Sequence, residues 1–224
     1  MRTERAKLSL FKILAFYVIF LAVWSVFEIW LVPIMESSLG AWEQALCGTV
    51  IKLAVWTVPA VLLVRHYKED VLFSLREMFT ARFKWYKYTL ILLGFAAYNI
   101  IGALIVNRNL SISSEFEISS LIGTVIFVGI TEEVVFRGFL LNALLKRMKA
   151  WPAVLLTALM FLVIHFPIWI HEGVWLSNLL SGGFFAVILL SIIFSWTFIK
   201  SKNIIVPIVL HMAWNLLIIL FFGS

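Results

Sequence analysis

Long apolar segments alternate with short polar segments along the chain, and the alternation occurs seven times. Each apolar segment is long enough to form a helix that crosses the roughly 30 Å hydrocarbon core of a bilayer, at about 1.5 Å per residue. Neither the period of two that is typical of strands nor a repeat of fixed length is present. The pattern therefore predicts an all-α polytopic membrane helix bundle of about seven transmembrane helices, over residues 10–35, 45–64, 88–106, 120–145, 151–170, 176–199 and 204–222.

The polar segments between the predicted helices differ in charge on alternate sides. Most basic residues lie before residue 13 or in residues 65–87, 146–149 and 200–202, whereas the opposite segments are mainly acidic. Lysine and arginine are enriched in the loops that stay on the cytoplasmic side. We therefore expect the N-terminus inside and the C-terminus outside.

Composition supports a membrane protein and excludes several other classes. Hydrophobic residues make up 63% of the chain and charged residues 13%, against about 45–50% and 25% in ordinary soluble domains. Such a chain is neither disordered nor an ordinary soluble globule, which would expose large apolar patches. The net charge of +6 follows from the basic loops, so we expect the lipid bilayer and not nucleic acid as a partner. Cys47, the single cysteine, is expected to be a packing residue.

Ionisable and amide side chains inside the predicted spans are the candidates for chemistry, because polar groups in a bilayer are expensive and are therefore usually functional. Helix geometry places these groups at overlapping depths, about 10–21 Å from the basic ends of their spans. We expect them to converge in one cavity. The candidates are Glu132, Glu133 and Arg137 in the fourth span, His165 in the fifth, and His211 and Asn215 in the seventh. Phe161, four residues before His165, could wall the ring of that histidine.

Spacing within each span suggests separate roles for these residues. Glu133 and Arg137 are four residues apart and can pair, whereas Glu132 is turned about 100° away and is free to face the cavity. A carboxylate and a histidine can deprotonate a water molecule, and a second histidine with an amide can stabilise an oxyanion. Neither G-x-S-x-G nor H-E-x-x-H is present. Hydrolysis is therefore the chemistry that these residues favour.

Three motifs resemble those of the CPBP family, the CAAX-protease and bacteriocin-processing (Abi-type) intramembrane endopeptidases. They are Glu-Glu-x-x-Phe-Arg-Gly over residues 132–138, Phe-x-x-x-His over residues 161–165 and His-x-x-x-Asn over residues 211–215. The resemblance implies a catalytic helical core over residues 120–217. Residues 1–119 are then an N-terminal three-span region, and residues 1–224 form a single integral membrane unit.

The same resemblance implies residue roles and a substrate class. Glu132 and His165 would activate the attacking water, His211 and Asn215 would form the oxyanion site, and Glu133, Arg137 and Phe161 would support the site. The substrate would be a membrane-associated or lipidated peptide, either of CAAX type or a leader or bacteriocin-like peptide. No cofactor is required by these residues, although Glu132, His165 and His211 could also hold a divalent metal such as zinc.

Alternatives of other classes remain open at this point. The chain could be a non-proteolytic membrane scaffold or bacteriocin self-immunity protein, or a transporter that relays protons through its carboxylates and histidines. We expect a multi-pass protein of a prokaryotic cell membrane, and the sequence leaves the oligomeric state open. Within residues 65–87, apolar residues recur at helical spacing among basic ones, which favours an amphipathic helix on the inner leaflet over an ordinary solvated loop. These apolar residues are Val71, Leu72, Leu75, Met78, Phe79 and Phe83.

Overall fold

The computed structural model describes residues 7–223, and the regular structure within them is entirely helical. Seven helical spans in this part of the chain are long and apolar enough to cross a membrane. The all-α class and the seven predicted helices are therefore confirmed. The spans are Leu10–Ser38, Ala41–His66, Thr89–Val106, Ile118–Leu144, Ala150–His171, Gly183–Ser201 and Ile205–Phe222.

Several spans contain wider turns of π-helix, labelled η, between α-helical parts. The first three spans consist of α1 (Leu10–Val26), η1 (Phe27–Leu31) and α2 (Val32–Ser38), then α3 (Ala41–Lys52), η2 (Leu53–Thr57) and α4 (Val58–His66), then α6 (Tyr86–Val106). A short helix, α5 (Leu75–Thr80), lies between α4 and α6.

The remaining spans contain all the candidate site residues. The fourth consists of α7 (Ile118–Ser120), η3 (Leu121–Val128), α8 (Gly129–Glu133), η4 (Val134–Leu141) and α9 (Asn142–Leu144). The fifth is α10 (Ala150–Val163) followed by α11 (Phe166–His171). The sixth is α13 (Gly183–Ser201), preceded by the short helix α12 (Trp175–Ser181), and the seventh is α14 (Ile205–Phe222).

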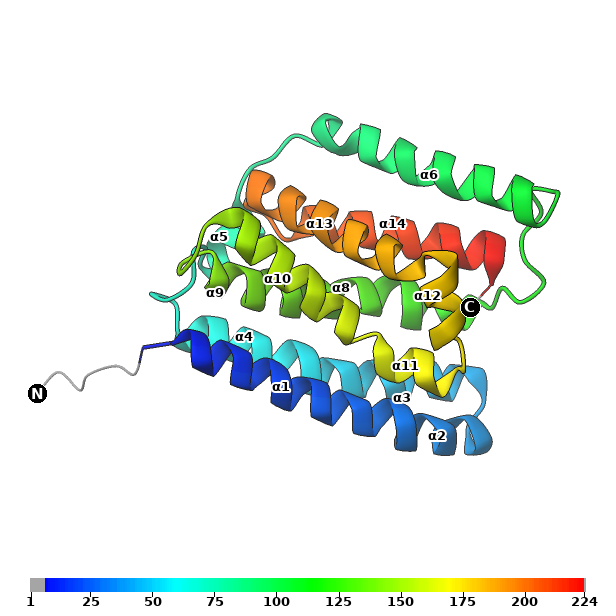
Figure 1. The fold of residues 1–224 in the computed structure, drawn as a ribbon, viewed down its shortest axis with the longest axis horizontal. Coiled ribbons are helices and arrows are strands. Elements are labelled where there is room, and N and C mark those ends of the chain that lie inside the picture. The colour runs from blue at the N-terminus through cyan, green and yellow to red at the C-terminus, as the bar shows by residue number, and fades with distance from the viewer. Residues whose placement is uncertain (1–6, 224) are drawn as a thin grey trace, which may run out of the picture.

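The fourth span lies at the centre of the bundle, with α1 and α4 on one side of it and α13, α14 and α6 on the other (Figure 1). Every residue from Thr131 to Leu144 is buried. A helix that is buried all round can carry polar groups away from lipid when neighbouring helices supply partners for them. The acidic residues of the fourth span are therefore inside the protein.

Two spans are broken by residues that a straight helix does not accommodate. Gly182 has a positive φ of 86°, a conformation that glycine adopts without strain, so the sixth crossing helix begins at Gly183 and not at residue 176 as predicted. In the fifth span α10 ends at Val163, and α11 begins at Phe166 with Pro167 in its first turn. Proline lacks an N–H and clashes with the preceding turn, so it favours such a break.

The segment 65–87 differs from its prediction. Between α4 and α6 only Leu75–Thr80 is helical. The amphipathic helix predicted in this segment is therefore limited to this short helix, and its position on the inner leaflet stays a prediction. The hydroxyl of Ser74 accepts from the backbone N–H of Glu77, and hydrogen bonds from Ser74 to the Glu77 carboxylate lower the pKa of Glu77. Phe73, just before this helix, is held against the bundle by Asn142, which bonds both the N–H and the carbonyl of Phe73. A tertiary partner, which periodicity cannot reveal, therefore sets this conformation.

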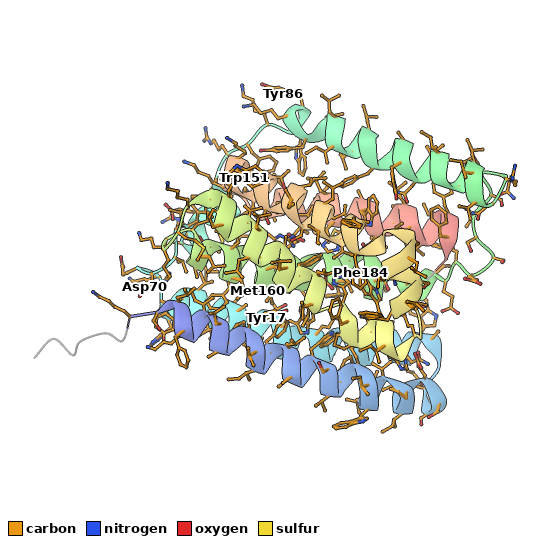
Figure 2. All side chains as sticks on the ribbon, viewed as in Figure 1. Tyr17, Asp70, Tyr86, Trp151, Met160 and Phe184 are labelled. Carbon is orange, nitrogen blue, oxygen red and sulfur yellow. The ribbon has the colours of Figure 1, made fainter. Side chains whose placement is uncertain are left out.

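The basic segments meet at one end of the bundle. Arg147 donates to the carbonyls of Leu8 and Asp70, and Asn203 donates to the carbonyl of Ala81. Burial lowers the pKa of Arg147 and the charge of Asp70 opposes this shift. Further along the bundle, the Tyr17 hydroxyl donates to the carbonyl of Met160 at 2.7 Å, and the two residues lie side by side in Figure 2. The predicted grouping of basic loops on one side is thus observed, and the direction of insertion stays a prediction.

Candidate active site

Two adjacent acidic residues of the fourth span lie inside the protein. Glu132 is 6% exposed and Glu133 is fully buried. Both face α14, where His211 is 6% exposed. A buried carboxylate needs hydrogen-bond donors or cations around it, so the partners of these two residues define the site.

Glu133 is the central acceptor of the cluster. Its Oε1 atom accepts a hydrogen bond from Arg137 Nη1 at 2.8 Å and lies 2.8 Å from His211 Nδ1. The predicted pair of Glu133 and Arg137 is therefore confirmed. Its connection to His211 was not predicted, because the spacing within one helix says nothing about contacts with another.

Arg137 is fully buried and is held by a third helix. Its Nη2 atom donates to the hydroxyl of Ser191 at 2.7 Å and to the backbone carbonyl of Ser191 at 3.0 Å. The guanidinium carbon lies 4.6 Å from the ring centre of Phe161 and 5.4 Å from that of Phe194. Such cation–π contacts stabilise a desolvated cation. Arg137 therefore joins η4, α10 and α13 around the acidic pair.

Ser191 and Phe194 of α13 were missing from the sequence-based set. Ser191 is fully buried and so is Ser195, one turn later. Phe194 stacks on the His211 ring with the centroids 4.9 Å apart and an interplanar angle of 21°. Hydroxyl groups inside an apolar span were a signal for Ser191, but nothing in the sequence indicated the position of Phe194.

His211 contacts both acidic residues through opposite ring nitrogens. Its Nδ1 atom faces Glu133, and its Nε2 atom lies 3.9 Å from Glu132 Oε2. That oxygen of Glu132 is buried without a hydrogen-bond partner among the described residues. Glu132 is thus directed toward the imidazole, and it retains an unused acceptor next to it.

The approach of α8 to α14 depends on a glycine. A Cβ atom added at Gly129 would lie 2.8 Å from Met212 Cγ and 3.4 Å from the Met212 backbone nitrogen. Real Cβ atoms essentially never make the first of these contacts. Gly129 therefore permits the short distance between helices over which Glu133 reaches His211.

His165 lies in the break between α10 and α11. Its backbone N–H bonds the carbonyl of Leu162, three residues back, and the carbonyl of Phe161 lies 2.6 Å from the His165 Nδ1 atom. A carbonyl can only accept, so Nδ1 carries the hydrogen and Nε2 is an acceptor in the neutral ring. In this arrangement Nε2 of His165 is the ring nitrogen that is free to accept a hydrogen bond or a proton.

Phe161 connects the two histidines. Its ring centre is 4.9 Å from that of His165 and 6.1 Å from that of His211. The structure thus brings together the candidate residues of the fourth, fifth and seventh spans, as their predicted depths indicated. Phe161 lies between the imidazoles as an apolar wall.

Asn215 lies one turn beyond His211 but has a partner of its own. Its Nδ2 atom donates to the backbone carbonyl of Thr124 in η3 at 3.0 Å. One of its two N–H groups is therefore engaged, and the other remains available. The predicted common direction of the Asn215 and His211 donors is not observed for these two bonds, because each donor faces a different group of the fourth span.

The candidate metal ligands do not form a metal-binding set. Across residues 7–223, no group of three or more histidine, cysteine, aspartate or glutamate side chains has a geometry that could hold a metal ion. A catalytic zinc site needs three protein ligands around one open position. Glu132, His165 and His211 are thus not brought together as such a set in the described part of the chain, and a role for them as metal ligands stays a prediction.

Comparison with known proteins relates part of the chain to a known family. No curated protein and no solved structure matches the chain. Residues 114–217 match the family model described as Type II CAAX prenyl endopeptidase Rce1-like. This range includes all three motifs and every candidate residue from Glu132 to Asn215. The seven apolar spans and this match support an integral membrane protein whose residues 114–217 are similar to the Rce1-like CAAX protease family.

Proposed function

We propose that the chain is an intramembrane endopeptidase that hydrolyses peptide bonds of membrane-associated peptides. The observation that carries this proposal is the buried, unpartnered oxygen of Glu132 beside His211, in a family segment that also supplies a base-form histidine. An acceptor left without a partner inside a bilayer protein is costly. We infer that a reacting water molecule supplies the hydrogen-bond donor that this oxygen lacks.

In the proposed reaction, Glu132 and His165 hold and activate the water. The carboxylate accepts one hydrogen bond, and His165 Nε2 takes the proton as the water oxygen attacks the peptide carbonyl carbon. Collapse of the tetrahedral intermediate then breaks the C–N bond. The proton held by His165 passes to the leaving amine, so that a carboxylic acid and an amine are released.

His211 and Asn215 are proposed to stabilise the oxyanion. In its protonated form His211 can donate from Nε2, while its Nδ1–H stays on Glu133. Asn215 can donate its second N–H, because the first is bonded to Thr124. Donors fixed in advance, in a site shielded from water, are effective at stabilising a developing negative charge.

Glu133, Arg137 and Phe161 are proposed as positioning residues. Glu133 orients the His211 ring, Arg137 neutralises Glu133, and Phe161 separates the two imidazoles. None of them has to contact the substrate in this scheme. We infer that they keep the reacting groups in place.

The substrate follows from the family and the setting. We propose a lipidated C-terminal peptide of the CAAX type, with a leader or bacteriocin-like peptide as the other candidate. Because the polar groups lie among apolar spans, we propose that the substrate peptide is itself held in the membrane. The proposed location is the cell membrane of a prokaryote.

A cleavage assay with the full-length protein in liposomes tests the proposal. The probe is a farnesylated peptide with a C-terminal CAAX sequence and a fluorophore–quencher pair across the scissile bond. Wild type should cleave it, and Glu132→Gln should lose more than about 99% of the rate while it keeps its melting temperature. Glu69→Gln, which neutralises an exposed acid outside the spans, is the matched control. Full activity of folded Glu132→Gln would contradict the mechanism.

A further inference from the structure

An apolar groove runs between α6 and α13, with α14 as its floor. It has a volume of about 490 Å³. Its lining is almost entirely apolar, and part of it faces the outside of the bundle. Residues that line it include Ile91, Phe95 and Tyr98 from α6, Leu189 and Ile193 from α13, and Trp214 from α14.

A basic pocket of about 500 Å³ lies at one end of the same two helices. Arg82 and Lys84 precede α6, Lys87 is in its first turn, and Lys200 is in the last turn of α13. None of the four forms an ion pair with any residue in the described range 7–223. Figure 2 labels Tyr86, the first residue of α6. The pocket therefore carries positive charge that the protein itself does not neutralise.

The pocket and the groove lie one helical turn apart along α6, and the two together are called the seam here. Lys87 and Tyr88 line or border the pocket, and Ile91 begins the groove one turn later on the same helix. From Lys87 to Tyr98 the helix rises about 17 Å. This is close to one leaflet of a hydrocarbon core that is about 30 Å thick. The seam is thus basic where a lipid headgroup would lie and apolar where its acyl chain would lie, and its length is close to the thickness of one leaflet.

Two other cavities in the described part of the chain each have only one of these two properties. An apolar groove between the first two spans, lined by Phe27, Trp30 and Val55, has no basic lining residue. A pocket lined by Lys7, Arg65 and Lys68 is lined mainly by charged residues and lacks the apolar lining of the groove. The combination at α6 and α13 therefore distinguishes this seam from a general lipid-facing surface.

We propose that the seam between α6 and α13 binds an anionic phospholipid from the leaflet at the basic end of the bundle. The phosphate lies among Arg82, Lys87 and Lys200, and an acyl chain follows the groove toward Trp214. Charge complementarity selects the headgroup, because basic pockets between transmembrane helices attract anionic lipids. Apolar burial holds the chain. The proposal does not depend on the peptidase activity.

The inner end of the groove borders the aromatic residues around the candidate active site. Phe95 contacts Trp214 at 5.2 Å and Phe194 at 6.2 Å between ring centres, and Phe194 stacks on His211. A bound acyl chain therefore packs against the wall behind His211. It contacts none of the proposed catalytic atoms.

Lipid titrations followed by native mass spectrometry test the proposal on the full chain in detergent. The probes are palmitoyl-oleoyl phosphatidylglycerol and the zwitterionic palmitoyl-oleoyl phosphatidylcholine. Wild type should bind the anionic lipid at least about tenfold more tightly, and Lys87→Gln/Lys200→Gln should reduce that affinity about 30-fold. The matched control is Lys146→Gln/Lys149→Gln, which removes two exposed charges at the same end of the bundle and should leave the affinity within about twofold of wild type.

The acyl-chain part of the proposal is tested at Gly94, a residue that lines the groove. A Cβ added there meets no atom within 4 Å, so Gly94→Leu should fold normally and fill the groove. We expect about tenfold weaker binding of phosphatidylglycerol, because apolar contacts of roughly two methylene groups are lost. Gly48→Leu is the control, since a Cβ at Gly48 also enters open space but lies in another span.

Several results would overturn the proposal. Equal binding of the two lipids would show that the charge of the headgroup does not contribute to binding. Equal losses of affinity in the two lysine double variants would show that general surface charge, and not the pocket, attracts the lipid. If Gly94→Leu bound phosphatidylglycerol as tightly as wild type does, the groove would not be the site of the acyl chain. A dimer that dissociates in Gly94→Leu, or displacement of the lipid by the farnesylated peptide, would assign the groove to another occupant.

Discussion

His211 Nδ1 and Glu133 Oε1 lie 2.8 Å apart and connect the seventh span to the fourth. The same oxygen accepts a hydrogen bond from Arg137, so one carboxylate both neutralises a buried cation and orients an imidazole. This arrangement leaves His211 Nε2 directed toward Glu132. The active-site proposal therefore depends on Glu133 as much as on the residues that would touch substrate.

Replacing Glu133 should affect both stability and activity. In Glu133→Gln the fully buried Arg137 loses its counter-charge, and breaking a buried pair on one side destabilises proteins by about 3–5 kcal/mol. The loss of the carboxylate that orients His211 should also lower kcat about tenfold or more. Thermal unfolding in detergent and the liposome cleavage assay measure the two effects.

The double variant Glu133→Gln/Arg137→Met separates these effects. Removing the cation as well should recover much of the stability, since an apolar replacement of a buried pair is often neutral, whereas kcat should stay low. Recovery of both quantities together would show that Glu133 acts on activity only through folding.

Ser191 and Ser195 offer a matched pair on one face of α13. Ser191 accepts from Arg137, whereas the Ser195 hydroxyl is buried with no partner in the described part of the chain. Ser191→Ala should lower the free energy of unfolding by about 1–3 kcal/mol, because it removes a hydrogen bond to a buried charge. Ser195→Ala should change it by less than about 0.5 kcal/mol. Equal shifts in melting temperature for the two variants would contradict the proposed support of Arg137.

Pro167 should control the orientation of His165. In Pro167→Ala the helix can continue through residues 164–166, and the backbone N–H of His165 then competes with its Nδ1–H for the carbonyl of Phe161. We expect kcat to fall about tenfold, because the imidazole loses the bond that sets its tautomer. Stability should stay the same or rise slightly.

Kinetics and circular dichroism of Pro167→Ala check this expectation. Pro152→Ala is the control, because Pro152 lies near the start of α10 and far along the helix from His165. An unchanged kcat in Pro167→Ala, together with increased helix content, would show that the break does not matter for catalysis.

Replacing Gly129 by alanine, which adds a single methyl group, should lower both stability and activity. The added methyl group of Gly129→Ala would meet Met212 Cγ at 2.8 Å, and overpacking of this kind destabilises by about 1–3 kcal/mol. It should also lower kcat, because α8 and α14 have to separate where Glu133 meets His211. Gly129→Ala/Met212→Ala should recover the activity in part, since the second change removes the clashing atom. A Gly129→Ala protein as stable and active as wild type would exclude a tight helix contact here.

The sequence by itself determined the fold class and the candidate residues. Apolar length is a local property, so the seven spans could be located from it, and the expense of polar groups in a bilayer directed attention to Glu132, Glu133, Arg137, His165 and His211. The pairing of Glu133 with Arg137 was also local, because residues four apart share a helix face. These predictions needed no knowledge of how the helices pack.

Contacts between helices were decided only by the tertiary structure. The bond of His211 to Glu133, the support of Arg137 by Ser191 and the docking of residues 71–74 on Asn142 each join segments that are far apart in the chain. For the same reason periodicity did not determine the extent of the amphipathic helix predicted within residues 65–87, where only Leu75–Thr80 is helical between α4 and α6. Periodicity records which faces are apolar, but packing decides which atoms meet, because the energy of a buried polar group depends on the partner that another helix brings to it.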